Sequence, residues 1–310
     1  MKKILFSLLF VAAILSAAPV CVGAPSLYPV VVNGRWGFVN KSGETVINPQ
    51  FDRAEAFAEG LAPVRMGRWG YVDASGKMEI NPQFDKADVF SEGLAAVKLG
   101  GGPGPFVPYD PRPYSPYNPY GGGGRYGYIS PDGKYAINPQ FEDAGAFSGG
   151  LAAVKMGRWG FIDKTGKVVI NPQFEKAQQF SEGLAAIRLG GKWGFVDRTG
   201  KMTINSQFDD AGRFVKGLAP VRQGKRWGYI DPTGKFVINP QFDDAAAFSE
   251  DLAPVRQSGH WGFVDLSGKI VINPQFDEAD SFVDGLAHVK AGGRFGYINP
   301  SGKYIWNPTK

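Results

Sequence analysis

Short apolar runs alternate with turn-forming residues along almost the whole chain, and residues 150–183 show the pattern well: "GLAAVKMGRWGFIDKTGKVVINPQFEKAQQFSEG". The runs "LAAVK", "WGFID" and "KVVIN" are rich in β-branched and aromatic residues and are separated by Gly-containing turns, which predicts a three-stranded antiparallel meander. Pro172 has no N–H to donate, so we expect the third strand to end before it. Phe174, Ala177 and Phe180 follow at steps of three, which fits a helical turn or a loop pinned by two aromatic side chains, and we favour the loop.

The same pattern recurs eight times. An aromatic residue followed by Gly marks each copy, at Trp36, Trp69, Tyr126, Trp159, Trp193, Trp227, Trp261 and Phe295. Successive copies are 33 or 34 residues apart, except for one gap of 57 that holds the 24-residue insertion "GGPGPFVPYDPRPYSPYNPYGGGG" at residues 101–124. The first and last copies both contain all three runs, so residues 27–310 are predicted to form one uninterrupted array apart from this insertion.

Each predicted sheet is apolar on both faces. In "WGFID", Trp159 and Phe161 point to one face and Ile162 to the other, because side chains alternate along a strand. A repeat of 34 residues cannot cover both faces alone, so neighbouring repeats must do so. We therefore expect the eight aromatic residues before the Gly to be buried anchors between repeats, and each Gly, such as Gly160, to leave a gap for the neighbour's side chains.

The linked motifs "RWGFVD", "GKxVINPQF" and "FSEGLAxV" resemble those of the bacterial WG-repeat family, also called KWG. The resemblance covers the chain from residue 27 onward except the insertion, and it implies an all-β, propeller-like scaffold with no particular reaction. The repeats depart from the motif where Tyr126 and Phe295 replace Trp, where Ser206 replaces Pro and where Asp251 replaces Gly. We expect the aromatic changes to reshape the packing and the other two to loosen local turns.

Two architectures fit eight such repeats. A closed propeller-like ring is favoured, since propellers have about 4–8 blades, while the short repeat keeps an open β-solenoid as the alternative. Trp306 stands where other repeats carry Ile170 or Ile238, and a large apolar side chain in the last repeat favours contact with the first repeat or the insertion.

The N-terminus has the three parts of a secretory signal peptide. Lys2 and Lys3 precede an apolar stretch and then small residues, which predicts a signal over residues 1–23 with cleavage near 23/24. No apolar segment reaches the roughly 20 residues that a transmembrane helix needs. The single cysteine, Cys21, follows a poor lipidation motif, so lipid anchoring is the less favoured alternative. The sequence thus predicts an exported protein of the periplasm, cell surface or exterior, without disulfides.

Charge and candidate chemistry point away from nucleic acid and from catalysis. The formal net charge is only +5, and the basic residues are spread along the repeats. They form two columns: Arg65, Lys98, Lys155, Arg188, Arg222, Arg256 and Lys290, and Arg35, Arg68, Arg125, Arg158, Lys192, Arg226 and Arg294. Pairing with nearby acids is the favoured interpretation, and a track for an anionic polymer is the alternative.

No cluster of residues indicates a catalytic, metal or cofactor site. His260 and His288 are single variations on repeat columns without partners. Turns such as "DKTGK" lack the ligand series of a calcium loop and the long Gly-rich run of a phosphate loop, so hairpin chemistry explains them. The paired acids Asp209-Asp210 and Asp243-Asp244 recur at a loop position, which fits a solvated rim.

The insertion is the one feature that occurs once. It is rich in Pro, Gly and Tyr, which favours polyproline II with flexible glycines, and loops of this length are often functional. We select Tyr109, Arg112, Tyr114, Tyr117 and Tyr120 as candidate binding residues. The sequence thus predicts a non-catalytic exported scaffold that binds a protein or a cell-envelope glycan through rim loops or the insertion. A hydrolase with a site in a central cavity, a purely structural spacer and a tolerated loop without function remain alternatives.

Overall fold

A computed structural model describes residues 27–40, 42–100 and 124–309 of the 310-residue chain. Every regular element in these ranges is a β-strand. The chain forms two compact units, one that ends at Pro172 and one that begins at Gln173.

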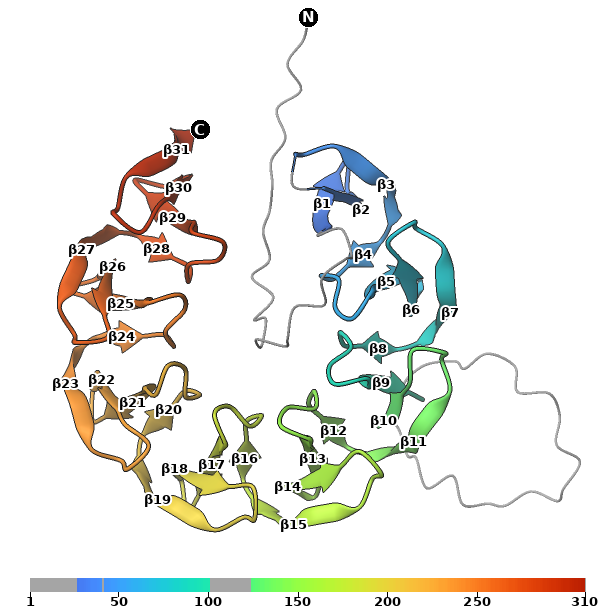
Figure 1. Cartoon of the computed structure of the whole chain (residues 1–310), viewed down its shortest axis with the longest axis horizontal. Coiled ribbons are helices and arrows are strands. Elements are labelled where there is room, and N and C mark those ends of the chain that lie inside the picture. The colour runs from blue at the N-terminus through green and yellow to red at the C-terminus, as the bar shows by residue number, and fades with distance from the viewer. Residues whose placement is uncertain (1–26, 41, 101–123, 310) are drawn as a thin grey trace, which may run out of the picture. The chain divides into compact units, whose positions relative to one another are not determined.

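The first four sheets follow the chain in order (Figure 1). Blade 1 contains β1 (Tyr28–Val32), β2 (Arg35–Val39) and β3 (Thr45–Phe51). Blade 2 contains β4 (Arg53–Ala54), β5 (Leu61–Met66), β6 (Arg68–Asp73) and β7 (Met78–Phe84). Blade 3 contains β8 (Lys86–Ala87), β9 (Ala95–Leu99), β10 (Arg125–Ile129) and β11 (Tyr135–Phe141). Blade 4 contains β12 (Asp143–Ala144), β13 (Leu151–Met156), β14 (Arg158–Asp163) and β15 (Val168–Phe174).

The other four sheets repeat the arrangement. Blade 5 contains β16 (Lys176–Ala177), β17 (Leu184–Leu189), β18 (Lys192–Asp197) and β19 (Met202–Phe208). Blade 6 contains β20 (Asp210–Ala211), β21 (Ala219–Gln223), β22 (Arg226–Ile230) and β23 (Phe236–Phe242). Blade 7 contains β24 (Asp244–Ala245), β25 (Leu252–Gln257), β26 (His260–Asp265) and β27 (Ile270–Phe276). Blade 8 contains β28 (Glu278–Ala279), β29 (Ala287–Ala291), β30 (Arg294–Ile298) and β31 (Tyr304–Thr309).

The fold class is all-β, with the small antiparallel sheets of an eight-bladed β-propeller, which confirms the prediction. The three predicted strands of each repeat are present, but the prediction missed a short fourth strand in blades 2 to 8. In blade 4 the residues Asp143–Ala144 pair with Lys155 and Val154, although they follow directly on the last strand of blade 3. The segment after Phe141 therefore crosses from one sheet into the next. The corresponding "FEKAQQF" is neither a helical turn nor simply a pinned loop, because Lys176–Ala177 form a strand before the loop.

The third strand does not end before its proline, which corrects the expectation for Pro172. The strand Val168–Phe174 runs through "NPQF" in one piece. It is the last strand in its sheet order, so no further strand needs the missing N–H. In blade 3 the register of the last two strands shifts between the pairs Tyr126↔Phe141 and Tyr128↔Ile137. This shift places a β-bulge around Pro139.

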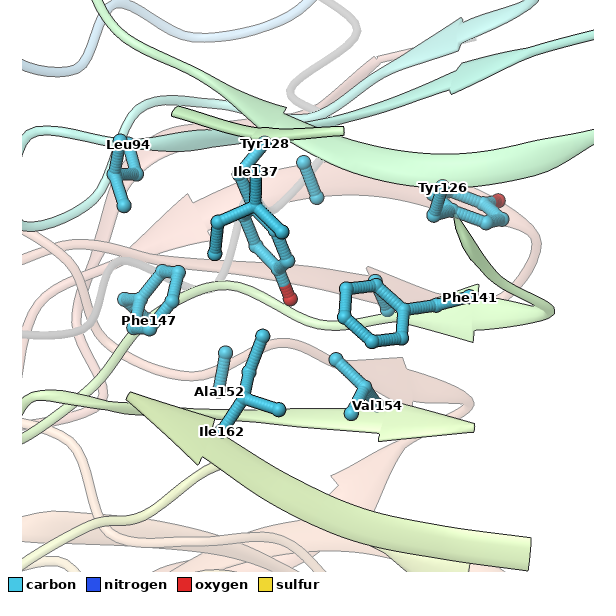
Figure 2. Packing of buried hydrophobic residues seen from close by; sticks show 11 residues of the cluster. Leu94, Tyr126, Tyr128, Ile137, Phe141, Phe147, Ala152, Val154 and Ile162 are labelled. Carbon is cyan, nitrogen blue, oxygen red and sulfur yellow. The ribbon is translucent and has the colours of Figure 1, made fainter. Parts of the chain in front are cut away.

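Hydrophobic clusters join each blade to the next within a unit, as the sequence predicted. Figure 2 shows one of them: Tyr128, Ile137 and Phe141 of blade 3 lie against Val154 and Ile162 of blade 4. All five are at most 4% exposed. Equivalent clusters join blades 1 and 2, 2 and 3, 5 and 6, 6 and 7, and 7 and 8. We call the face with Tyr128 the front face of a blade and the face with Val154 its back face.

The aromatic residue before the Gly is not the main anchor, and this corrects the sequence analysis. Tyr126 and Trp193 are 7% and 8% exposed, whereas Trp36, Trp69, Trp159, Trp227 and Trp261 are only half-buried. Phe295 is 42% exposed. The fully buried aromatic side chain stands two residues later, at Phe38, Tyr71, Tyr128, Phe161, Phe195, Tyr229 and Phe263, each 0% exposed. Trp36, Trp69, Trp227 and Trp261 pack against the margins of their clusters, whereas Trp193 is part of one.

The Gly after the Trp has a different role from the predicted gap for a neighbour. A Cβ built on Gly127 would lie 2.6 Å from the carbonyl oxygen of Ile137 and 2.7 Å from the nitrogen of Pro139. The corresponding distances to the Ile carbonyl are 2.4–2.6 Å at Gly37, Gly70, Gly160, Gly194, Gly228 and Gly262. The bulge of the third strand of the same blade therefore fills the space, and only glycine allows that approach.

Candidate functional site

The insertion takes the place of the turn between β9 and β10, and the pairing of these two strands is unchanged. β9 and β10 pair in register up to Leu99↔Arg125. At the two ends of the insertion, a Cβ on Gly100 would lie 3.6 Å from the Cα of Gly124. Leu99-Gly100 and Gly124-Arg125 thus correspond to the ordinary turn Leu189-Gly190-Gly191-Lys192 of blade 5. The candidate binding residues Tyr109, Arg112, Tyr114, Tyr117 and Tyr120 lie outside the described residues.

The "DxTGK" turns are structural, as predicted. The Oδ1 atom of Asp163 accepts hydrogen bonds from the Thr165 hydroxyl at 2.6 Å and from the Thr165 and Lys167 amides at 2.9 and 3.1 Å. The hydroxyl bond is the main reason that the pKa of Asp163 lies below its usual value, and the amide bonds add to the effect. The carboxylate of Asp163 thus accepts hydrogen bonds from residues of its own turn, as Asp commonly does in tight turns.

In the part of the chain that the structure describes, members of both basic columns form ion pairs with acids at or next to the connections between consecutive blades. Pairs of the column before the Trp are Arg35–Asp52, Arg68–Asp85, Lys192–Asp209 and Arg226–Asp243. Pairs of the other column are Lys155–Glu142, Arg188–Glu175 and Lys290–Glu278. These pairs match the favoured interpretation and leave less free charge for an anionic polymer.

The same acids also hold the hairpin turns. Asp209 accepts the Gly224 amide at 2.7 Å as well as the Lys192 ammonium at 2.5 Å. Both bonds lower its pKa, the one from Lys192 more strongly. Its neighbour Asp210 accepts the Ala211 amide at 3.0 Å. Asp209 and Asp210 therefore both hold local backbone structure.

The histidines differ in their surroundings. His260 is exposed, and its Nδ1 lies 3.3 Å from the carbonyl oxygen of Ser258. His288 stacks on Phe295 with ring centroids 4.9 Å apart, and its Nδ1 lies 3.1 Å from the Asp280 carboxylate. Within the described ranges, no group of three or more His, Cys, Asp or Glu side chains is placed to hold a metal ion. No helix in that part of the chain is long and apolar enough to cross a membrane.

The "SEG" loops link consecutive blades through a strained glutamate. Glu182 has a φ of 52°, a left-handed conformation that is uncommon for residues other than Gly. Its carboxylate accepts the amides of Lys216 and Gly217 in the next blade at 2.7 and 2.9 Å. Glu59, Glu92 and Glu250 have the same conformation and accept amides of the following loop. The left-handed backbone conformation of these glutamates is therefore explained by the hydrogen bonds that their side chains make to the next blade.

The two non-aromatic departures from the repeat have different consequences. Asp251 does not adopt the positive φ of the glycines at its column, such as Gly183 and Gly217, so its turn has a different backbone conformation. Asp251 forms an ion pair at 2.5 Å with Lys216, which itself replaces the Glu of the previous loop. The two replacements thus compensate each other electrostatically. At Ser206 the third strand keeps the bulge of the other blades, because a Cβ on Gly194 would lie 2.7 Å from the Ser206 nitrogen.

One titratable group was missed by the sequence analysis. Asp88 lies just after β8, where its backbone carbonyl accepts the hydroxyl of Tyr71 at 2.8 Å. Much of the residue's surface is exposed, but the loss of water around its carboxyl group raises its pKa to about 6, and the charge of Asp143 adds to the shift. The only sequence signal is that Asp88 occupies the column of Gly145, Gly212 and Ala246.

The chain matches a family model described as the WG containing repeat. The matches cover residues 36–68, 69–102, 126–158, 159–193, 193–227, 227–259 and 261–294, which is more than half of the chain. No curated protein sequence is similar enough to count as a relative.

Solved structures are similar in fold. A crystal structure of a eukaryotic initiation factor has a TM-score of 0.60 at 9% identity, over 92% of this chain and 86% of that one. PorZ, a surface component of the type-IX secretion system of Porphyromonas gingivalis, has a TM-score of 0.40 at 12% identity, over 90% of this chain and 44% of that one. The likeness to the initiation factor, at 9% identity, concerns the fold alone, and the lower TM-score of PorZ supports no conclusion.

Proposed function

Because the chain belongs to the WG-containing repeat family, we propose that it is a non-catalytic, exported scaffold that binds a macromolecular partner. The partner is a protein or a cell-envelope glycan, and the insertion between β9 and β10 is the main contact. Export rests on the signal-like residues 1–23, with their two lysines and apolar stretch.

The way the insertion joins its blade is the observation that carries the proposal. Its ends meet at a hairpin whose register is intact, so the 24 residues at 101–124 contribute nothing that the blade needs to close. Closing a loop of that length costs conformational entropy, and loops this long are usually functional, so a binding role would account for the insertion. Its tyrosines supply large, rigid contact surfaces with a polar tip, as binding loops do.

The local use of the repeated charges supports the scaffold as well. The turn acids and the described ion pairs stabilise hairpins, so the columns that recur in every blade serve the fold. Function is then expected at a feature that occurs once.

Two variants test the proposal. The first deletes residues 101–123 and joins Gly100 to Gly124, which recreates the Gly-Gly turn of blade 5. The second replaces the same residues with a Gly/Ser linker of equal length. The intact protein should capture a reproducible set of cell-envelope proteins or glycans that both variants lose, with unchanged thermal unfolding. Capture that is equal for all three proteins would contradict the proposal, and the absence of any capture would favour the structural spacer.

The alternative is an envelope hydrolase, and Asp88 is the group with which to test it. Loss of water around its carboxyl and the nearby Asp143 charge raise the pKa of Asp88 to about 6. Release of reducing sugars from cell-wall glycan by the intact protein, lost in Asp88→Asn and retained in the deletion variant, would establish the hydrolase in place of the scaffold.

A further inference from the structure

Exposed side chains recur on the last strand of each blade, the strand farthest from the short first strand (Figure 1). In β23, Ile238 and Phe242 are buried in the cluster that blade 6 forms with blade 7. Val237, Asn239 and Gln241 of the same strand are exposed on the back face, because side chains alternate along a strand. We call this exposed set, with the exposed lysine directly before the strand, the outer stripe. It consists of Lys235, Val237, Asn239 and Gln241 in blade 6 and of Lys269, Val271, Asn273 and Gln275 in blade 7.

The outer stripe is exposed in blades of both units. Blades 2, 3, 6 and 7 each share hydrophobic clusters with two neighbours of their own unit. Their outer stripes are exposed all the same. The exposure is therefore a property of the last strand within its own unit.

The two amide residues of the stripe are the same in blades 1 to 7. They are Asn48, Asn81, Asn138, Asn171, Asn205, Asn239 and Asn273, with Gln50, Gln83, Gln140, Gln173, Gln207, Gln241 and Gln275. The equally exposed position two residues before the Asn varies, and it holds Val46, Glu79, Ala136, Val169, Thr203, Val237 and Val271. A common origin of the repeats would preserve both kinds of position alike. The amides are therefore retained for a reason of their own.

Hydrogen bonding within the chain does not supply this reason. In the part of the chain that the structure describes, the side chains of Asn239, Gln241, Asn273 and Gln275 form no hydrogen bond. Arg226 does bond to Gln241, but it does so at the backbone carbonyl oxygen. The repeated turn acids and loop glutamates, by contrast, bond backbone amides of the chain. The free donors and acceptors of the outer stripe are thus available to a ligand.

The lysines of the stripe are available as well. Among the described residues, those of blades 4 to 8 form no ion pair, and they are Lys167, Lys201, Lys235, Lys269 and Lys303. The acids of the same turns, such as Asp231 and Asp265, hold the turns through Oδ1. Blades 2 and 3 differ, because their lysines pair with Glu79 and Asp132. In the second unit, each stripe therefore places an unpaired ammonium group beside two amides.

We propose that the outer stripes of blades 6 and 7, with their equivalents in the second unit, bind an acidic polysaccharide. The lysines bond its carboxylates, and the amides of Asn and Gln donate to and accept from its hydroxyl groups. A ligand that repeats along its length can engage consecutive stripes, and the joint affinity then exceeds that of one stripe. An extended peptide that adds to the sheet edge fits less well, because Pro240 and Pro274 lie in these edge strands. The site is separate from the insertion, so it adds a ligand to the proposed scaffold.

The test is titration calorimetry of the full-length protein with two uronic acid polymers, alginate and polygalacturonate. We expect at least one polymer to bind, to bind more tightly than its own trisaccharide, and to bind less tightly as salt is added. The double variant Lys235→Gln/Lys269→Gln should weaken binding about tenfold, because two exposed ion pairs are lost. Lys176→Gln/Lys225→Gln is the matched control, because it removes two exposed lysines of the same unit that lie outside the stripes.

A second double variant tests the amides at constant charge. Gln241→Ala/Gln275→Ala should weaken binding of the polymer severalfold and leave the unfolding temperature unchanged, because both side chains are exposed and unbonded. Polyglutamate, which carries carboxylates without hydroxyl groups, should bind more weakly than the uronic acid polymer and should not respond to this variant.

Several outcomes would overturn the proposal. One is that neither polymer binds, and another is that the control pair of lysines weakens binding as much as the stripe pair. Polyglutamate binding as tight as that of the uronic acid polymer would show that charge alone acts and would exclude a glycan site. A fall in the unfolding temperature of the Gln variant would assign the amides to the fold. Loss of polymer binding on deletion of residues 101–123 would place the site on the insertion, whereas loss of only the captured partner would support two separate sites.

Discussion

Substitution of Gly127 by Ala should destabilise the protein far more than its single methyl group suggests. The new Cβ would stand 2.6 Å from the Ile137 carbonyl oxygen, and ordinary contact begins near 3.4 Å. The backbone of β11 would have to move by about 0.8 Å, and Ile137 and Phe141, which are 4% and 2% exposed, would move with it. Forced overpacking of this kind costs about 3 kcal/mol.

Gly145→Ala is the matched control for Gly127→Ala. Gly145 does not have a left-handed conformation. A Cβ on Gly145 would have one neighbouring atom within 4 Å, at 3.8 Å, and the equivalent residue of blade 7 is already an alanine, Ala246. Its substitution should change stability by less than about 0.5 kcal/mol. In scanning calorimetry, about 3 kcal/mol corresponds to a fall in Tm of roughly 6–12 °C for a cooperative unit of this size. Equal Tm values for the two variants would refute the reasoning about the bulge.

Three further predictions concern packing, blade linkage and pH. Phe263→Ala should lower the free energy of unfolding by about 3–5 kcal/mol, and Trp261→Ala by less than half of that, because Phe263 is fully buried and Trp261 half-buried. Urea unfolding of both variants measures the difference. A loss of stability at Trp261 that equals or exceeds the loss at Phe263 would contradict this prediction. Glu182→Ala should destabilise by about 1 kcal/mol through the loss of two amide bonds to the next blade, and unchanged unfolding would show that these bonds are dispensable. The carboxyl of Asp88 has a raised pKa, so its charged form is disfavoured in the folded state, and the contribution of Asp88 to stability should fall as the pH rises from about 4 to about 6. Asp88→Asn should remove this fall, which unfolding curves at pH 4 and pH 7 would show, whereas identical pH profiles would rule out the assignment.

The repeat and its three long strands could be predicted because their signals are redundant. Each run is bounded by turn residues, and the pattern occurs eight times, so an ambiguous copy is corrected by the others. The short strand Lys176–Ala177 could not be predicted, because two residues show no alternation. The strand through Pro172 was missed because proline excludes an inner strand only, and the sequence does not say which strand lies at the edge.

The sequence could not tell which aromatic residue of the second strand is the more deeply buried, the Trp or the residue two positions later. Trp261 and Phe263 point to the same face, and period two cannot tell which of them lies at the margin of the cluster. The tight approach at Gly127 depends on the bulge, which follows from strand pairing and not from local sequence.

The candidate sites also differ in how far the sequence could predict them. The insertion is visible in the sequence because it breaks a fixed period. Phe295 and Trp306 are visible as departures from the repeat, but the sequence does not tell how much of either side chain is exposed. Asp88 is a single acid among many, and only its neighbours give it an unusual pKa.

The central claim is that each blade is stable only through its contact with the next. Val154 of blade 4 is 0% exposed and lies in the cluster with Tyr128 and Phe141 of blade 3, so Val154→Ala should weaken both blades. Hydrogen–deuterium exchange of the intact chain tests this most directly. The account predicts faster exchange in β10 and β11 as well as in β13 and β14. Faster exchange confined to blade 4, with blade 3 protected as before, would contradict it.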